Sequence, residues 1–121
     1  MNDKTLLWVW LTTLRGMTAL KITSLMDKFN SIEEIYSIEN AEEFKGIGLI
    51  RKNDIIELLN KDTKKAKDII RKIDIINGYI ITYENEDYPQ KLKALPNPPY
   101  VLYVRGKLPD FDNAVSIAIF L

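Results

Sequence analysis

The chain has 121 residues, of which 46% are hydrophobic, so it can bury a real core. Its 17 basic and 17 acidic residues balance, which excludes a global attraction to nucleic acid or to an anionic membrane. Any such binding must come from a local patch. The absence of cysteine and histidine excludes disulfides, thiolate chemistry, the usual zinc ligand sets and histidine general bases.

We do not expect the N-terminal residues to form a targeting signal. The apolar run from Leu6 to Leu11 is too short to span a bilayer, and it lacks both a strongly basic lead and a small-residue cleavage site. The absence of cysteine fits a reducing compartment. We therefore expect a soluble, cytoplasmic protein without a membrane partner.

The first half of the sequence is typical of short helices. Apolar residues recur at helical spacing, and residues that commonly cap helices precede each apolar run. The capping positions are Asp3, Thr18, Ser31, Asn40, and Asp62 or Thr63. Ser31 with Glu34 and Asn40 with Glu43 have the spacing of capping boxes. The pattern predicts a mainly α domain over residues 1–76, ended by Asn77-Gly78.

The second half changes character and predicts strands. The expected order is strand 79–83, helical turn 88–92, rigid proline loop 96–99, strand 100–104 and apolar run 115–121. Apolar and polar residues do not alternate in the last run. Such a pattern is typical of a central strand that is covered on both faces and has parallel neighbours. Because no further residues could supply those neighbours, we expect an incomplete α/β segment over residues 77–121.

Two glycine turns separate pairs of predicted helices and suggest a double helix-hairpin-helix. The first is Leu14-Arg15-Gly16-Met17 and the second is Lys45-Gly46-Ile47-Gly48. Such a turn can bind a phosphate through outward backbone N–H groups and the positive end of the next helix. The candidate DNA-binding residues are Arg15, Lys45, Gly46, Gly48, Arg51 and Lys52. The alternative, which the zero net charge favours, is that the turns only pack helices together.

Two further charged features have simpler interpretations. A basic helix carries Lys61, Lys64, Lys65, Lys67, Arg71 and Lys72, with Asp62, Asp68 and Asp74 interleaved. It could contact phosphates, but pairing of Asp68 with Lys64 or Lys72 favours a solvated face. Glu86 and Asp87 are adjacent carboxylates in a turn without a base, metal ligand or nucleophile nearby, so we expect no catalysis there.

The segment that follows the first predicted strand resembles the DNA-processing protein A (DprA/Smf) family. Its pattern is Tyr-Pro-x-x-Leu, a spacer, then Pro-Pro-x-Val-Leu-Tyr-x-x-Gly. The matching residues are Tyr88, Pro89, Leu92, Pro98, Pro99, Val101, Leu102, Tyr103 and Gly106. The strand-like Ile80 to Tyr83 and the helical front half with Gly46-Ile47-Gly48 also fit the family.

The resemblance implies a SAM-like or helix-hairpin-helix domain followed by a Rossmann-like domain. It implies single-stranded DNA binding and loading of the RecA recombinase in natural transformation, with no enzymatic activity, cofactor or metal. The family continues from a strand like residues 115–119 into a Gly-Ser-Arg turn that would hold a phosphate. Phe120-Leu121 stand there instead. We therefore expect the family's main DNA site and dimer surface to be missing from this chain, DNA binding to be weak, and the truncated end to self-associate.

Two other classes of function are considered. The helical half could be a protein-interaction module without nucleic-acid binding, with Trp8 and Trp10 as anchors, although core positions are favoured for at least one of them. A nucleotide-handling enzyme could share the start of the Rossmann-like fold. The missing glycine turn and the lack of any acid–base constellation argue against the enzyme.

Overall fold

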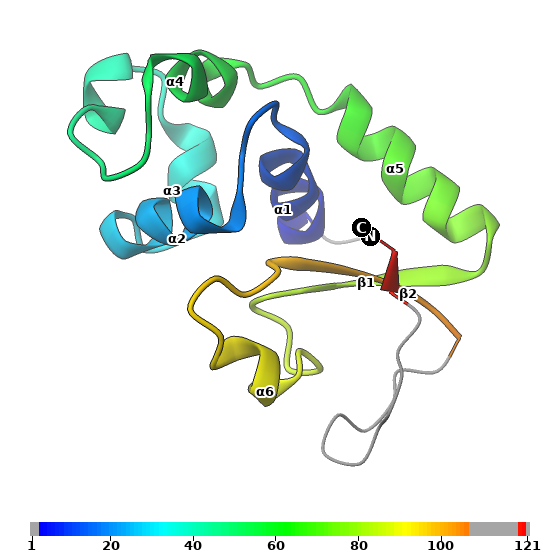
Figure 1. Cartoon of the computed structure of the whole chain (residues 1–121). Coiled ribbons are helices and arrows are strands. Elements are labelled where there is room, and N and C mark those ends of the chain that lie inside the picture. Colours follow the sequence, from blue (N-terminus) through cyan, green and yellow to red (C-terminus); the bar gives the residue numbers. More distant parts are fainter. Residues whose placement is uncertain (1–2, 107–118, 121) are drawn as a thin grey trace.

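The computed structural model describes residues 3–106 and 119–120, and it is mostly helical with a small antiparallel sheet. The elements are α1 (Asp3–Thr13), α2 (Ala19–Lys28), α3 (Ile32–Ser37), η1 (Ala41–Phe44), α4 (Lys52–Leu59), α5 (Lys64–Ile75), β1 (Gly78–Thr82), α6 (Gln90–Lys93), β2 (Val101–Arg105) and β3 (Ile119–Phe120). In Figure 1, α1 lies at the centre, with α2 to α4 on one side, α5 on the other and the sheet beneath. No helix in the described ranges is long and apolar enough to cross a membrane.

Side-chain caps fix most of the helix starts where the sequence predicts them. The hydroxyl of Thr18 accepts a hydrogen bond from Lys21 N at 3.3 Å, and Ser31 accepts one from Glu34 N at 3.1 Å. At the last long helix, the N-cap residue Thr63 makes no side-chain cap hydrogen bond, and Asp62 before it accepts from Lys64 N at 2.9 Å. Asn40 accepts from Glu42 N rather than from Glu43 N, and it begins a single 3₁₀ turn in place of the predicted capping box.

Both tryptophans lie in the core, at 0% and 1% exposure, so neither is free to anchor a partner. The Trp8 ring stacks on Tyr100 with centroids 5.4 Å apart, and its Nε1 donates to Glu84 at 2.9 Å. The Trp10 ring meets Tyr36 edge-on at 4.8 Å, and its Nε1 donates to the carbonyl of Asn60 at 3.1 Å. Each indole thus buries its apolar surface while its single donor is satisfied.

The sheet buries residues on both faces. In the β1–β2 pairing, Ile80 lies opposite Tyr103, and these side chains pack against the helical core. The next pair, Ile81 and Leu102, points to the other face and packs with Tyr88. This alternation is what a period of two residues requires. The α1 helix covers one face and the loop around α6 covers the other (Figure 1).

The hydrophobic core crosses the predicted domain boundary at residue 76. Tyr100 and Val101, from the second half, belong to the same buried cluster as the residues of α1 to α4. The Tyr100 hydroxyl also lies 2.8 Å from the Thr23 hydroxyl on α2. The division into residues 1–76 and 77–121 stays a prediction, but the two parts share their packing.

The predicted third strand lies partly outside the described residues. Residues 115–118 and Leu121 are not described, whereas Ile119–Phe120 pairs with β2 opposite Val104 and Tyr103. This pairing is antiparallel, so the expectation of parallel neighbours is wrong for the part that the structure describes. Antiparallel pairing needs no crossover helix, and it uses the edge of β2 that β1 leaves open.

Candidate nucleic-acid interface

The two glycine turns have different backbone requirements. Gly16 and Gly46 both have φ of 77°, in the left-handed region that favours glycine. Gly48 does not adopt positive φ. Instead, a Cβ there would lie 3.1 Å from Ser24 Oγ, so the second turn approaches α2 closely. The glycines therefore shape the turns and bring the second turn against the first hairpin.

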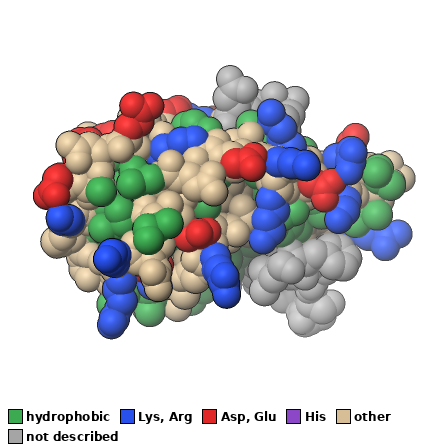
Figure 2. All heavy atoms as spheres, turned by 90° about the horizontal axis from the view of Figure 1, so that it is seen from above, with side chains coloured by type: hydrophobic (Ala, Val, Ile, Leu, Met, Phe, Trp, Pro, Cys, Tyr) green, Lys and Arg blue, Asp and Glu red, His purple; other side chains and the backbone are tan. Residues whose placement is uncertain are grey.

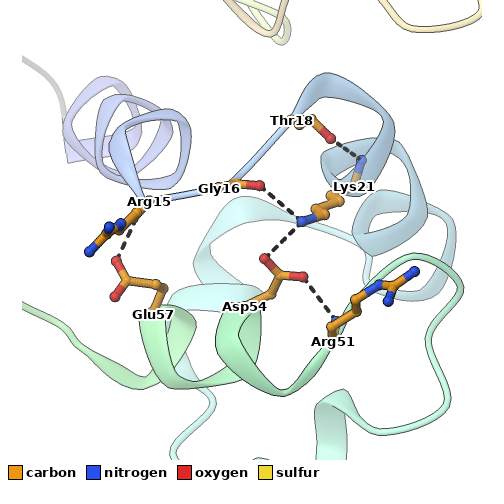
Figure 3. A network of polar contacts seen from close by, with 7 residues as sticks. All are labelled: Arg15, Gly16, Thr18, Lys21, Arg51, Asp54 and Glu57. Atoms are coloured by element: carbon orange, nitrogen blue, oxygen red, sulfur yellow. Dashed lines mark hydrogen bonds and ion pairs between the residues drawn. The ribbon is translucent and has the colours of Figure 1, made fainter.

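A polar network joins the first turn to the start of α4 (Figure 3). Its centre is Asp54, which is 3% exposed. One carboxylate oxygen accepts from Arg51 N at 2.9 Å, and the other accepts from Lys21 Nζ at 3.0 Å. The same ammonium donates to the carbonyl of Gly16 at 3.0 Å. At the edge of the network, Glu57 accepts from Arg15 N at 3.2 Å.

This network already fills the position where a hairpin would receive a phosphate. The Asp54 carboxylate caps the N-terminus of α4, so its own negative charge meets the positive end of the helix. Lys21 neutralises that carboxylate. A phosphate could be bound here by side chains, but capture by the backbone N–H of Arg51 would require Asp54 to move.

The structure brings only part of the predicted site together. Arg15 and Arg51 line one cleft of about 590 Å³, and Lys52 follows at the start of α4. Their side chains form no ion pair with any residue in the described ranges. Figure 3 shows the Arg51 side chain extending away from Asp54. We call the cleft that Arg15 and Arg51 line the hairpin cleft; Lys52 is next to Arg51 in the chain but does not line it.

The remaining predicted residues belong to the second turn. Lys45 is paired with Glu42 at 2.7 Å, and both side chains are largely exposed, so water can compete for this pair. Gly46 and Gly48 serve the turn itself. Sequence reasoning missed Lys21 and Asp54. An acidic residue at the third position of a helix signals a cap and could have identified Asp54, whereas no local pattern identifies Lys21.

The basic helix is only partly neutralised. Asp68 pairs with Arg71 and, at 3.2 Å, with Lys72, and the hydrogen bond and charge of Lys72 lower the pKa of Asp68. Lys61 lies over the rings of Trp10 and Tyr36, each at 5.2 Å, and burial lowers the pKa of its ammonium. Of the two partners predicted for Asp68, Lys72 is the one found, and Lys64 forms no ion pair with the described residues.

The carboxylate pair singled out in the sequence lies in the turn after β1. Glu86 and Asp87 are both exposed there. The described part of the chain contains no group of three or more side chains able to hold a metal ion.

Residues 79–120 match the family described as DNA recombination-mediator protein A. The match runs from β1 to β3 and includes the Tyr-Pro to Arg-Gly segment, so it confirms the resemblance to the DprA family. It leaves the helical half outside. No curated protein and no solved structure matches the chain.

Proposed function

We propose that this chain, with its second half in the DNA recombination-mediator protein A family, acts in DNA recombination and natural transformation by binding single-stranded DNA. The family match over residues 79–120 is the observation that carries the proposal. Binding, not catalysis, is the proposed activity, in the cytoplasm and with the RecA recombinase as protein partner. The helical half is proposed to be a SAM-like, helix-hairpin-helix module.

The hairpin cleft offers the charges that such binding needs. Arg15 and Arg51 line one cleft of about 590 Å³, and Lys52 follows Arg51 in the chain at the start of α4. Guanidinium groups bind phosphate oxygens in a bidentate manner. Glu57 opposes this charge, while Lys21 and Asp54 cancel each other.

Few contacts imply weak and salt-dependent binding. For single strands, the slope of log K against log salt is about −0.7 for each phosphate neutralised. The three cations Arg15, Arg51 and Lys52 would therefore contribute about −2 to the slope, and any further phosphate contact makes it steeper. The affinity should fall more than tenfold between about 50 and about 200 mM salt.

The test is a fluorescence anisotropy titration of the full chain with a labelled oligothymidine of about 15 nucleotides. We expect binding at low salt that weakens with at least this slope. An Arg15→Ala/Arg51→Ala variant should bind more weakly with a shallower slope, because it lacks two cations. A Lys28→Ala variant provides the control, since Lys28 lies at the end of α2 and donates to Glu43 O at 3.0 Å.

Two results would contradict the proposal. Absence of binding at about 50 mM salt would exclude single-stranded DNA as a ligand of this chain. Tight binding that is insensitive to salt would show that phosphate contacts do not provide the affinity.

A further inference from the structure

Positive charge is concentrated on α5 and the turn before it. Residues 61–72 contain six cationic and two acidic side chains, a net charge of +4 in a chain whose total is zero. Figure 2 shows these basic side chains gathered over the right-hand part of the molecule, where α5 lies. A local excess of this kind attracts anions even when the whole molecule is neutral.

Three lysines of this surface remain without a countercharge. Asp68 is engaged by Arg71 and Lys72. Lys64, Lys65 and Lys67 are exposed and form no ion pair with any residue that the structure describes. They line a groove of about 820 Å³ along α5. Lys64, Lys67 and Arg71 recur at a spacing of three and four residues, so they follow one side of the helix over about 10 Å.

An apolar pocket of about 570 Å³ opens beside this groove. Its walls come from the end of α1 and the turn after it, the start of α2, α5, and β2 with the two residues before it. They include Met17, Ile69, Ile73, Val101 and Tyr103. This volume is within the range of pockets that hold small aromatic ligands.

The pocket also holds polar groups at one end. The hydroxyls of Thr12 and Thr13 donate to the carbonyls of Val9 and Trp10, at 3.0 and 2.8 Å. Thr12 is also hydrogen-bonded to the side chain of Tyr103, whereas the Thr13 hydroxyl oxygen keeps lone pairs that can accept a hydrogen bond from a ligand. The pocket thus combines apolar walls with an acceptor suited to an N–H group of a nucleobase.

Lys65 lines both the cationic groove and the apolar pocket, so the two are adjacent. We infer that α5 and this pocket form a binding site for a single strand, in which Lys64, Lys65 and Lys67 contact phosphates and the pocket receives one unpaired base. This inference rests on the proposed function and adds a location to it. The pairing of a cationic track with an apolar base-binding surface is how proteins bind single strands without reading sequence.

A duplex fits this arrangement poorly. Its bases are paired and stacked, so none is free to enter the pocket without an unstacking cost of a few kcal/mol. An acidic peptide with an apolar side chain would meet the same charges. The match to a DNA recombination family favours the nucleic acid, and a peptide is one outcome of the test.

The experiment compares variants of the full chain in the oligothymidine titration. Lys64→Glu/Lys67→Glu reverses two cations that have no ion pair with the described residues, so the fold should be retained. A Lys28→Glu/Lys93→Glu variant carries the same change in net charge outside α5. We expect the α5 variant to lose affinity by tenfold or more, with a salt slope smaller by about 1.4. The control should lose much less.

A pocket variant separates base binding from charge. Ala19 lines the pocket at the start of α2, and Ala19→Trp would fill the pocket without changing the net charge. We expect lower affinity with an unchanged salt slope. In addition, a strand carrying 5-iodouracil should crosslink under light to a pocket residue such as Tyr103.

The outcomes separate this inference from the proposed function. If the wild type binds but the α5 and control variants bind equally, this site is wrong while single-stranded DNA binding stands. If the wild type binds no oligonucleotide, the proposed function fails and this inference fails with it. Displacement of the strand by duplex or by an acidic peptide at equal concentration would also overturn the inference.

Discussion

Replacing Asp54 by alanine should destabilise the fold more than any other single change in the polar network. The side chain is 3% exposed and accepts hydrogen bonds from Arg51 N and Lys21 Nζ. Loss of a helix cap costs about 1 kcal/mol. Loss of a hydrogen bond to a charged group costs about 1.5 kcal/mol or more, and Lys21, being partly exposed, recovers some of this from water. We expect a total of about 2.5 kcal/mol in the free energy of unfolding.

Urea denaturation followed by tryptophan fluorescence measures this change, because both indoles are buried in the folded state. Glu57→Ala is the matched control. Glu57 lies on the same helix and accepts one exposed hydrogen bond from Arg15 N, so its loss should cost less than about 1 kcal/mol. If Asp54→Ala costs no more than Glu57→Ala, the network does not hold the first turn to α4.

The same residue links stability to DNA binding. Asp54→Asn removes a negative charge from the cleft and from the N-terminus of α4 while keeping the size of the side chain. A charge at a helix end is worth about 0.3 to 1 kcal/mol, so affinity for the oligothymidine should rise about twofold to fivefold. An unchanged or lower affinity would show that phosphates do not approach this helix end.

Three further outcomes follow from the described contacts. Gly46→Ala should cost about 1 kcal/mol or more in urea melts because φ is 77°, and Gly48→Ala should cost less because it only presses on the Ser24 hydroxyl. Burial raises the pKa of Tyr88 in the folded chain, whereas tyrosines of the unfolded chain ionise near pH 10. Above that pH, the unfolded chain has therefore released a proton that the folded chain keeps. Stability should therefore fall above about pH 10, and Tyr88→Phe should reduce that fall in pH-dependent melts. Deleting residues 115–121 should raise solubility and leave the melting of the helical half nearly unchanged, because the part of this segment that the structure describes pairs with β2 through two residues. Loss of the transition would contradict this.

Helix positions could be predicted from the sequence because local rules determine them. Thr18 and Ser31 cap helices by their own hydroxyls, and the predicted strands coincide with β1 and β2 to within one residue. The glycine turns were likewise predictable, since positive φ at Gly16 and Gly46 reflects a steric property of the residue itself.

The arrangement of these elements could not be predicted from local patterns. The stacking of Trp8 on Tyr100 joins positions 92 residues apart, and it places the sheet in the helical core. The contact of Lys21 with Asp54 depends on how the two hairpins meet. The antiparallel pairing of β3 was missed for a different reason, because an apolar run without alternation does not specify the direction of its neighbour.

The candidate site likewise could be predicted only in part from local sequence patterns. Counting charges identified the basic helix but not which of its lysines stay unpaired, because Asp68 could reach several of them. The pocket beside the helix is built from four separate segments. No single segment of the sequence could indicate it.

The most direct test of the account is a comparison of single-stranded and duplex DNA of equal length and phosphate count per strand, titrated against the full chain at about 50 mM salt. The account predicts tighter binding of the single strand, since only an unpaired strand can offer a base as well as phosphates. Equal or tighter binding of the duplex, or no binding of either, would contradict it.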